Sequence, residues 1–289
     1  MILDIIINGL ISGSIYALLA IGFSLIYGIA RIVNLAHTAF YIVASFFLFV
    51  GTRKMGIHPA CAMLAAVFLV TVLGLISYRL FIDPIREHEA AVLIGTIALA
   101  IAMQEVMLLI FTGDYLSVPS LVDGYRTLLG VKVFYQQILT FGAALVILAA
   151  LWMLLRKTRL GLAIRSTAED REVANLMGIN ESRVAMITMG ISVGLAALTG
   201  AVIVPLTTLS PFMWMPPMIM MMAVVVLGGL GSIKGSFAGG YILGFAESLV
   251  VFLIPMGAFL KGSVALSIMI LVLLIRPEGL FGIAFEEER

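Results

Sequence analysis

Long apolar runs separated by short polar segments dominate the chain. A transmembrane helix needs about 20 mainly apolar residues to cross the hydrocarbon core of a bilayer. The pattern predicts membrane segments at 5–30, 34–50, 60–82, 90–112, 134–155, 184–209, 214–229, 236–254 and 258–275. The runs at 34–50 and 214–229 are short enough to be half-helices or re-entrant pieces, so we expect about eight to ten segments in all.

The apolar runs do not alternate with polar residues. A membrane β-strand alternates apolar and polar positions with a period of two, whereas the run at 145–151 is apolar at every position. The predicted fold is therefore all-α, a polytopic transmembrane helical bundle. Neither a linker nor a second domain is visible, so residues 1–289 are expected to form a single transmembrane domain.

The composition of the 289 residues supports this interpretation. Hydrophobic residues make up 62% of the chain and charged residues 11%, whereas a soluble domain is roughly 45–50% apolar and about 25% charged. A soluble enzyme and a disordered chain are therefore excluded. The net charge of +1 offers no basic face for nucleic acid. The one cysteine, Cys61, lies in an apolar run and is predicted to be a small buried hydrophobe.

Lysine and arginine positions predict the orientation of the chain, because basic residues favour the cytoplasmic side of a membrane protein. If the loop at 156–183 is cytoplasmic, the predicted segments place 12 basic residues inside and 5 outside. The N-terminus is then outside and the C-terminus inside. The first apolar run follows no basic residues and is too long for a signal-peptide core, so it is expected to stay as a transmembrane helix.

Glycines occur four residues apart within the predicted helices. The pairs are Gly9 and Gly13, Gly190 and Gly194, Gly235 and Gly239, and Gly240 and Gly244. Small residues at this spacing let two helix backbones approach closely in lipid. We interpret the pairs as packing positions within one bundle, with a subunit interface as the alternative.

The loop at 156–183 is the largest polar feature of the chain. It holds six basic and four acidic residues. Ser166 or Thr167 can cap a helix, acidic residues follow near its positive end, and Gly178 can end it. A short helix of about ten residues is therefore predicted, with a solvated linker as the alternative.

Apolar side chains follow the charges of this loop. Val173, Leu176 and Met177 need a partner surface, which a solvated linker does not offer. The stretch 172–178 resembles the EAAxxxG loop of ABC-importer permeases, with Val173 in place of the first alanine. In that family the loop is the coupling helix, which docks in a groove of a cytoplasmic ATPase. The resemblance implies an ATPase-coupling role for Ala168, Glu169, Asp170, Arg171, Glu172, Ala174, Leu176, Met177 and Gly178.

The wider chain resembles the permeases for branched-chain amino acids, the LivH type. The resemblance covers nearly the whole chain. It rests on GSIYAL at 13–18, YG at 27–28, NLAH at 34–37, RLG at 159–161, MGIN at 177–180, LGGLGSIKG at 227–235, ILGFAE at 242–247 and PEGL at 277–280. The family commonly continues its Asn-Phe-Ala-His motif with Gly-Glu, where this chain has Thr38 and Ala39.

The resemblance implies a multi-pass permease subunit of an ATP-driven importer in the bacterial inner (cytoplasmic) membrane. Its implied partners are a second permease subunit (a similar chain or a copy of itself), two cytoplasmic ABC ATPase subunits and an extracytoplasmic solute-binding protein. The chain carries no nucleotide-binding motif, so ATP and Mg are expected on the ATPases. We expect no cofactor or metal on this chain and no enzymatic activity of its own.

The implied solutes are branched-chain or other hydrophobic amino acids. Urea, short amides and aromatic acids are the alternatives, because related permeases serve them. A stand-alone secondary transporter or channel is a different alternative, since such proteins carry broken helices and intramembrane carboxylates. The loop at 156–183 favours the importer, because a lone transporter has no need for its apolar ridge.

Polar side chains within the apolar runs are candidates for the substrate path: Asn34, His37, Tyr41, Gln104, Glu105 and Glu247. Asn34 and His37 are one turn apart and are expected on one side of a helix. A structural hydrogen bond between the first two helices is the alternative to a pore contact. A carboxylate in hydrocarbon costs about 2.5–3.5 kcal/mol, so Glu105 and Glu247 are expected to face a cavity or a partner. For each, a bond to a neighbouring helix is the alternative to a transport role.

Three other features receive structural interpretations. The segment 228–236 lacks the spacing of a phosphate loop and is predicted to be a turn between two membrane helices. The methionines at 213–222 cluster around prolines, which we interpret as packing beside a proline-bent helix, with an apolar substrate lining as the alternative. Asp83 and Arg86 are predicted to pair on the surface of a short turn.

Overall fold

The protein is described by a computed structural model that covers residues 2–128 and 131–282. Its α-helices are α1 (Ile2–Ala30), α2 (His37–Phe49), α3 (Pro59–Ser77), α4 (Glu89–Phe111), α5 (Tyr135–Lys157), α6 (Arg159–Glu169), α7 (Arg171–Leu176), α8 (Glu181–Ile203), α9 (Met215–Gly228), α10 (Ile233–Leu253) and α11 (Lys261–Ile275). Shorter helical turns are η1 (Val50–Lys54), η2 (Tyr78–Ile82), η3 (Asp83–Ile85), η4 (Val204–Leu206) and η5 (Gly257–Leu260). Two strands, β1 (Tyr125–Leu128) and β2 (Val131–Phe134), complete the described elements.

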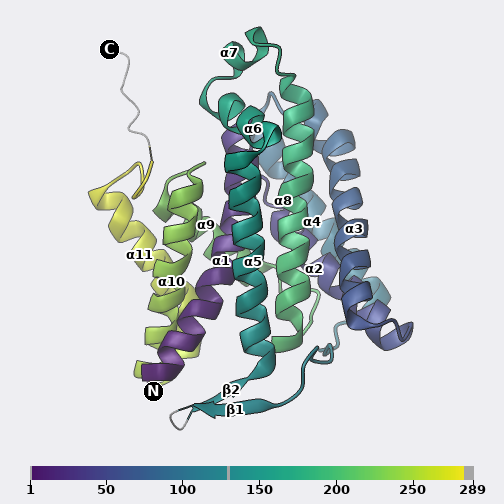
Figure 1. Cartoon of the computed structure of the whole chain (residues 1–289), viewed down its shortest axis with the longest axis vertical. Coiled ribbons are helices and arrows are strands. Elements are labelled where there is room, and N and C mark those ends of the chain that lie inside the picture. The colour runs from purple at the N-terminus through teal and green to yellow at the C-terminus, as the bar shows by residue number, and fades with distance from the viewer. Residues whose placement is uncertain (1, 129–130, 283–289) are drawn as a thin grey trace.

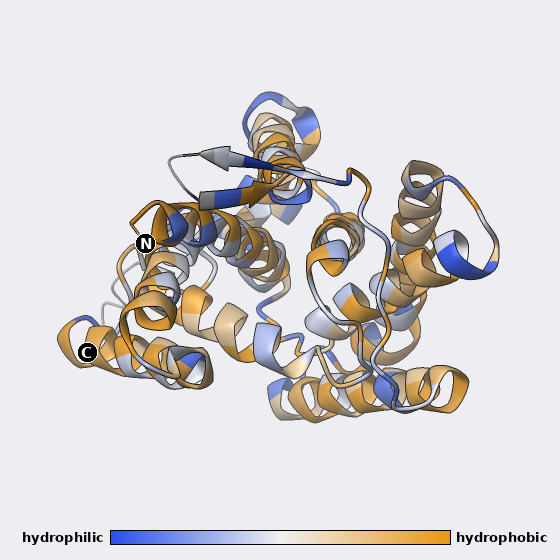
Figure 2. Cartoon of the chain, turned by 90° about the horizontal axis from the view of Figure 1, so that it is seen from below, coloured by the Kyte–Doolittle hydropathy of each residue, from blue (hydrophilic) through white to orange (hydrophobic). Residues whose placement is uncertain are grey.

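The long helices stand side by side in one bundle (Figure 1). Among the described residues, seven helices are long and apolar enough to cross a membrane, and α9 is a shorter apolar helix. The most apolar windows of α1 and α8 are 83% and 67% buried, whereas those of α3, α4, α5 and α11 are buried over 28% or less. The predicted polytopic helical bundle is therefore confirmed, with α1 and α8 at its centre and mainly hydrophobic residues on the outer helices (Figure 2).

The two ends of the bundle carry different features. The helices α6 and α7 lie at one end, which we name the loop end (Figure 1). The β1–β2 hairpin and the N-terminal end of α1 lie at the other, which we name the hairpin end. The described C-terminal segment, in which the backbone of Phe281 bonds to Gly228, returns to the loop end.

The helices α1 and α10 pack backbone against backbone. A Cβ atom added to Gly244 would lie 2.4 Å from the backbone nitrogen of Gly13, so the two backbones touch without intervening side chains. Two hydrogen bonds join the same helices on the loop-end side of this contact, at 2.8 Å between the hydroxyls of Ser14 and Tyr241 and at 2.6 Å between those of Ser24 and Ser236. The predicted role of these glycine pairs in packing within one bundle is confirmed.

The chain returns into the bundle between α1 and α2. The ring of His37, the first residue of α2, lies against Gly22 of α1, and its Nδ1 atom is 3.2 Å from the hydroxyl of Ser192 in the middle of α8. The membrane segment predicted from residue 34 therefore begins as irregular backbone, and Asn34 precedes the helix instead of lying on it. The helical conformation then continues through η1.

Irregular backbone at membrane depth needs hydrogen-bond partners inside the protein. Thr96 of α4 supplies one, because its Oγ1 atom accepts the N–H of Leu35 at 3.2 Å, while its hydroxyl hydrogen has the carbonyl oxygens of Leu93 at 3.2 Å and Val33 at 3.4 Å as acceptors. The Oδ1 atom of Asn34 accepts the N–H of Ala36 at 3.1 Å. These bonds satisfy part of the backbone of the segment that precedes α2 from within the protein.

The helix α9 is the second short membrane element. It follows an irregular segment in which Leu209 pairs with Leu116 through two backbone hydrogen bonds of 2.9 Å. Prolines occupy its first turn, where the missing N–H groups cost nothing. They therefore start the helix and do not bend it, which corrects the predicted proline kink. Met220 and Met221 are buried as predicted, whereas Met215 is exposed.

Two local features differ from the sequence prediction. The antiparallel hairpin of β1 and β2 was not predicted, because its short strands lie in a polar segment between two membrane helices. The rings of Tyr125 and Phe134 meet across it at a centroid distance of 6.1 Å. Cys61 is exposed on α3 and is not the buried residue that its apolar surroundings predicted. A helix surrounded by lipid exposes apolar residues, so hydrophobicity alone does not predict burial in a membrane protein.

Candidate functional site

The loop between α5 and α8 folds into two helices and not one. The Oγ1 atom of Thr158 accepts the N–H of Gly161 at 3.0 Å and caps α6. Asp170 separates the two helices and caps α7, because its Oδ1 atom accepts the N–H of Val173 at 3.0 Å. The predicted cap at Ser166 or Thr167 is wrong, since Thr167 lies within α6 and donates to the carbonyl oxygen of Ala163.

Gly178 ends α7 as predicted. Its φ of +84° is left-handed, and its N–H donates to the carbonyl oxygen of Asn175 at 3.0 Å. The N–H of Ile179 reaches back to Ala174 at 3.0 Å, which satisfies a further carbonyl group of the last turn. The chain therefore reverses sharply beyond α7 and enters α8.

An apolar ridge stands at the tip of this loop. Val173, Leu176 and Met177, the residues of the predicted ridge, are 54%, 85% and 79% exposed. The neighbouring Ala174 is buried, so α7 turns one face to the bundle and the ridge away from it. An exposed cluster of large apolar side chains beside charged ones is typical of a surface that another protein covers.

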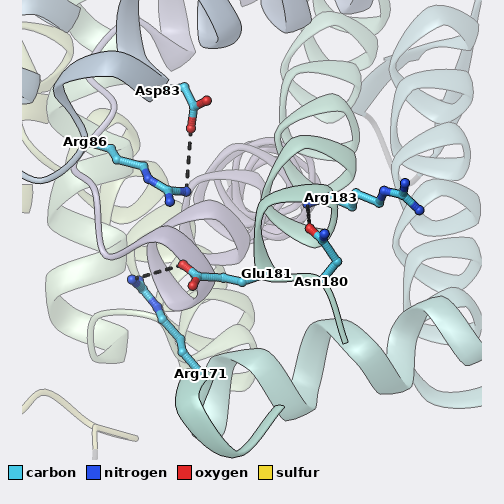
Figure 3. Close-up of polar contacts among 6 residues, drawn as sticks. All are labelled: Asp83, Arg86, Arg171, Asn180, Glu181 and Arg183. Atoms are coloured by element: carbon cyan, nitrogen blue, oxygen red, sulfur yellow. Dashed lines mark hydrogen bonds and ion pairs between the residues drawn. The ribbon is translucent and has the colours of Figure 1, made fainter. Parts of the chain in front are cut away.

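Polar contacts hold the loop on the bundle (Figure 3). The Nη1 atom of Arg171 lies 3.5 Å from the Oε1 atom of Glu181, the first residue of α8. The Oδ1 atom of Asn175 accepts the N–H of Glu181 at 3.3 Å, and Asn180 caps α8 by accepting the N–H of Arg183 at 3.0 Å. The orientation of α7 is therefore fixed relative to α8, one of the two central helices.

The predicted pair of Asp83 and Arg86 lies beside this junction (Figure 3). The atoms Oδ1 of Asp83 and Nη1 of Arg86 are 3.6 Å apart, and both side chains are about one-third exposed. The prediction of a surface ion pair in a short turn is confirmed. The turn is η3, which joins α3 to α4 at the loop end.

Three candidates for the substrate path are enclosed in the bundle. Asn34, His37 and Tyr41 are buried. The amide nitrogen of Asn34 lies 3.8 Å from the sulfur of Met189, and His37 contacts Ser192, so both residues face α8. The two residues share α8 as a neighbour, but not as positions of one helix as predicted, because Asn34 precedes α2, and the hydrogen bonds join the chain to α8 and not to the first helix. Ser192, which the sequence analysis did not single out, is the residue that positions His37.

Glu247 joins three helices. It lies in α10 and accepts a hydrogen bond from the hydroxyl of Tyr16 in α1. Its other oxygen lies 2.6 Å from the ammonium nitrogen of Lys261, at the start of α11. Glu247 is buried whereas Lys261 is half exposed, so the bridge runs from the interior to the surface. Neither partner was predicted, because both lie more than ten residues from Glu247 in sequence.

Gln104 and Glu105 occupy a different place, on the outer helix α4. The Nε2 atom of Gln104 donates to the Oε1 atom of Glu105 at 3.1 Å, and its Oε1 atom accepts from the indole N–H of Trp214 at 2.7 Å. Trp214 immediately precedes α9 and is buried. The side chain of Glu105 is exposed. The candidates of the substrate path therefore divide into an interior group and this pair on the outer surface.

The geometry defines a class of protein. The chain forms a multi-pass membrane bundle, in which irregular backbone precedes two of the shorter helices. An anchored loop presents an apolar ridge at one end of the bundle. Residues 5–274 match the family model described as branched-chain amino acid transport system, permease component. The chain belongs to this family of transport permeases.

Relatives cover nearly the whole chain. The high-affinity branched-chain amino acid transport system permease protein BraD of Pseudomonas aeruginosa is 32% identical over 96% of this chain and 94% of its own length. The corresponding protein LivH of Escherichia coli is 33% identical over 95% of this chain and 94% of its own length. The probable branched-chain amino acid transport permease protein LivH of Methanocaldococcus jannaschii is 30% identical over 97% of this chain and 92% of its own length.

A solved structure shares the fold. The structure entitled PsaBC from Streptococcus pneumoniae in complex with Fab matches with a TM-score of 0.52 at 15% identity, over 94% of this chain and 91% of that chain. At this identity the likeness concerns the arrangement of helices alone.

Proposed function

We propose that the chain is the membrane-spanning permease subunit of an ATP-driven importer for branched-chain amino acids, and that all of it acts as one permease domain. The anchored apolar ridge of Val173, Leu176 and Met177 carries the proposal. These side chains are exposed, and the helix that carries them is joined to the central helix α8 by the ion pair of Arg171 and Glu181. A force applied to the ridge would therefore reach the middle of the bundle.

The ridge is the proposed docking site for a cytoplasmic ATPase subunit. The surrounding residues 168–172 provide charged groups at the rim of the apolar surface, the arrangement found in many protein interfaces. The loop end is then cytoplasmic and the hairpin end extracytoplasmic, with the N-terminus outside and the C-terminus inside. Two ATPases, a second permease subunit and a binding protein that delivers the solute complete the proposed assembly.

The solute is proposed from the relatives, whose names specify branched-chain amino acids. ATP hydrolysis on the partner chains would move α7, and the bundle would alternate between outward-open and inward-open states. The irregular segments that precede α2 and α9 are suitable places for such a change, because few helical hydrogen bonds need to break there.

The first experiment is a pull-down of this chain from its native membrane in mild detergent. The masses of the co-purifying proteins are then measured. We expect two ATPase chains and a second permease. The variant Leu176→Asp should lose the ATPases, because it places a charge in the apolar interface. The matched control is Tyr115→Asp, since Tyr115 is 79% exposed at the hairpin end.

Two outcomes would overturn the proposal. A wild-type chain that purifies alone from membranes in which its neighbours are expressed would favour a stand-alone transporter. Retention of the ATPases by Leu176→Asp would show that the ridge is not their docking site. Uptake of labelled leucine with competition by urea, short amides and aromatic acids then tests the solute.

A further inference from the structure

Glu105 is an exposed carboxylate at membrane depth. The helix α4 spans Glu89–Phe111, and Glu105 lies six residues before its end at the hairpin end. At about 1.5 Å per residue, its Cα lies roughly 9 Å inside the end of the helix. A charged group facing hydrocarbon is unfavourable, by about 2.5–3.5 kcal/mol at the helix centre on insertion scales and by less nearer the helix end. Water, a ligand or another polar group therefore covers this face of α4 in the working protein.

The other outer helices present a different surface. On the described parts of α3, α4, α5 and α11, Glu105 is the only exposed ionisable residue that lies more than one turn from a helix end. At the same depth α3 exposes Leu64, Ala65 and Phe68, as a lipid-facing helix should. The face of α4 that carries Glu105 also exposes large apolar side chains, since Ile101 and Leu109, one turn before and after it, are 46% and 84% exposed, so the carboxylate is the feature that sets this face apart.

Small residues lead from Glu105 toward the loop end. Ala102 and Ala98 lie three and seven residues before Glu105, on the same face of α4, and both are exposed. Their side chains are smaller than those of Ile101 and Leu109, which are exposed one turn from Glu105. The face therefore combines a carboxylate near the hairpin end with two small residues nearer the loop end.

Glu105 is held beside the start of α9. The hydrogen bonds from Trp214 to Gln104 and from Gln104 to Glu105, 2.7 and 3.1 Å long, link the carboxylate to the residue that precedes α9. Because Trp214 is buried, this chain of bonds is anchored in the core of the bundle. Phe212 and Met215, two residues before and one residue after Trp214, are each 49% exposed and add apolar surface beside this tryptophan in the chain.

We propose that the Glu105 face of α4 lines the solute path and that its carboxylate accepts the ammonium group of an amino acid in transit. A carboxylate and an ammonium ion are complementary in charge, and their contact removes the penalty of an unpaired charge at this depth. The exposed side chains of Phe212 and Met215 would contact the aliphatic part of the same molecule. This inference rests on the proposed function, because it requires that amino acids cross the membrane along this chain.

The first test measures whether water reaches this face. Cys61 is replaced by serine, which leaves a cysteine-free chain whose leucine uptake is measured first. Single cysteines are then placed by Ala102→Cys on α4 and, as the matched control, by Phe68→Cys on α3. Each position lies nine residues from the helix end at the hairpin end. A charged, membrane-impermeant thiol reagent should modify the cysteine at 102 and should not modify the cysteine at 68. Addition of leucine-loaded binding protein and ATP should slow the modification at 102.

The second test measures the role of the carboxylate in the reconstituted complex. Leucine uptake by Glu105→Gln should fall by about tenfold or more, the size expected when a hydrogen bond to a charged group is lost. Glu105→Asp should retain part of the uptake, because the charge remains. ATPase subunits should co-purify with both variants as they do with the wild type.

Three results would overturn the inference. The first is a cysteine at 102 that the reagent does not modify, and the second is normal leucine uptake by Glu105→Gln. The third is a high yield of disulfide between two chains that carry Ala102→Cys, with no modification by the reagent, which would indicate that this face contacts a second subunit. Failure of the proposed function is distinguishable from these results, because the wild-type complex would then take up no leucine.

Discussion

Arg171 and Glu181 form an ion pair of 3.5 Å across the turn that separates α7 from α8. The pair joins the residue that begins α7 to the residue that begins α8, so the short helix and the central helix share one fixed orientation. The side chains are 34% and 22% exposed, which places the pair at the surface and not in the core. Such pairs contribute about 0.2–1 kcal/mol to stability, so the main effect of this one is on geometry.

Arg171→Ala is therefore expected to reduce uptake more than it reduces stability. Loss of the ion pair lets α7 rotate relative to α8, so ATP hydrolysis would be followed less often by transport. The measurement is the ratio of leucine transported to ATP hydrolysed in proteoliposomes. Arg183→Ala is the control, because its backbone N–H and not its side chain makes the contact with Asn180. Equal ratios for the two variants would contradict this prediction.

Gly178→Asp is expected to abolish transport while membrane insertion stays intact. The left-handed φ of +84° disfavours any residue with a Cβ, and the new charge would lie beside the apolar ridge. Gly56→Asp is a matched control, since Gly56 has a φ of +65°, equally open surroundings and a place in the turn between η1 and α3. Uptake and yield are compared for both variants. Transport by Gly178→Asp at the wild-type rate would show that α7 does not couple to an ATPase.

Glu247→Gln is expected to lower the melting temperature by several degrees, with uptake per folded molecule retained. The substitution removes the ion pair with Lys261 and weakens the acceptor for the hydroxyl of Tyr16, so α1, α10 and α11 are held together less firmly. A double-mutant cycle with Lys261→Gln measures the coupling between the two residues. A normal melting temperature with lost uptake would instead place Glu247 in the solute path.

Gly244→Ala is expected to reduce the yield of folded protein strongly. Its Cβ atom would lie 2.4 Å from the backbone nitrogen of Gly13, so α1 and α10 would have to separate along their whole contact. Gly142→Ala serves as the control, because nothing lies within 4 Å of a Cβ atom at that position of α5. Detergent-solubilised yield and melting temperature are the measurements. Similar values for the two variants would argue against backbone contact between these helices.

The fold could be predicted from the sequence wherever one property of the chain dominates. Apolar runs long enough to cross a bilayer give the helices, and Gly178 gives the end of α7. The division of the loop at Asp170 could not be predicted, because Ser166, Thr167 and Asp170 are all good caps and packing decides between them. Burial of Thr167 against the bundle settles the choice.

The candidate site was predictable only in part, for a related reason. Glu105 and Glu247 look alike in sequence, each a carboxylate in an apolar run, yet one is exposed and the other pairs with Lys261. What distinguishes them is the neighbouring helix, and sequence periodicity does not specify which helices are neighbours. The partners Ser192 and Trp214 were missed because a serine within a membrane helix, or a tryptophan beside one, carries no signal of its own.

The backbone contact between Gly13 and Gly244 limits how the molecule can change shape. Two helices that touch through their backbones cannot slide along each other without collision, and the hydroxyl pairs of Ser14 with Tyr241 and Ser24 with Ser236 would break as they moved. The helices α1 and α10 therefore behave as a single rigid pillar. In the proposed alternation between two states, we expect the remaining helices to move relative to this pillar, so its axis is the frame of reference in which the two states should be compared.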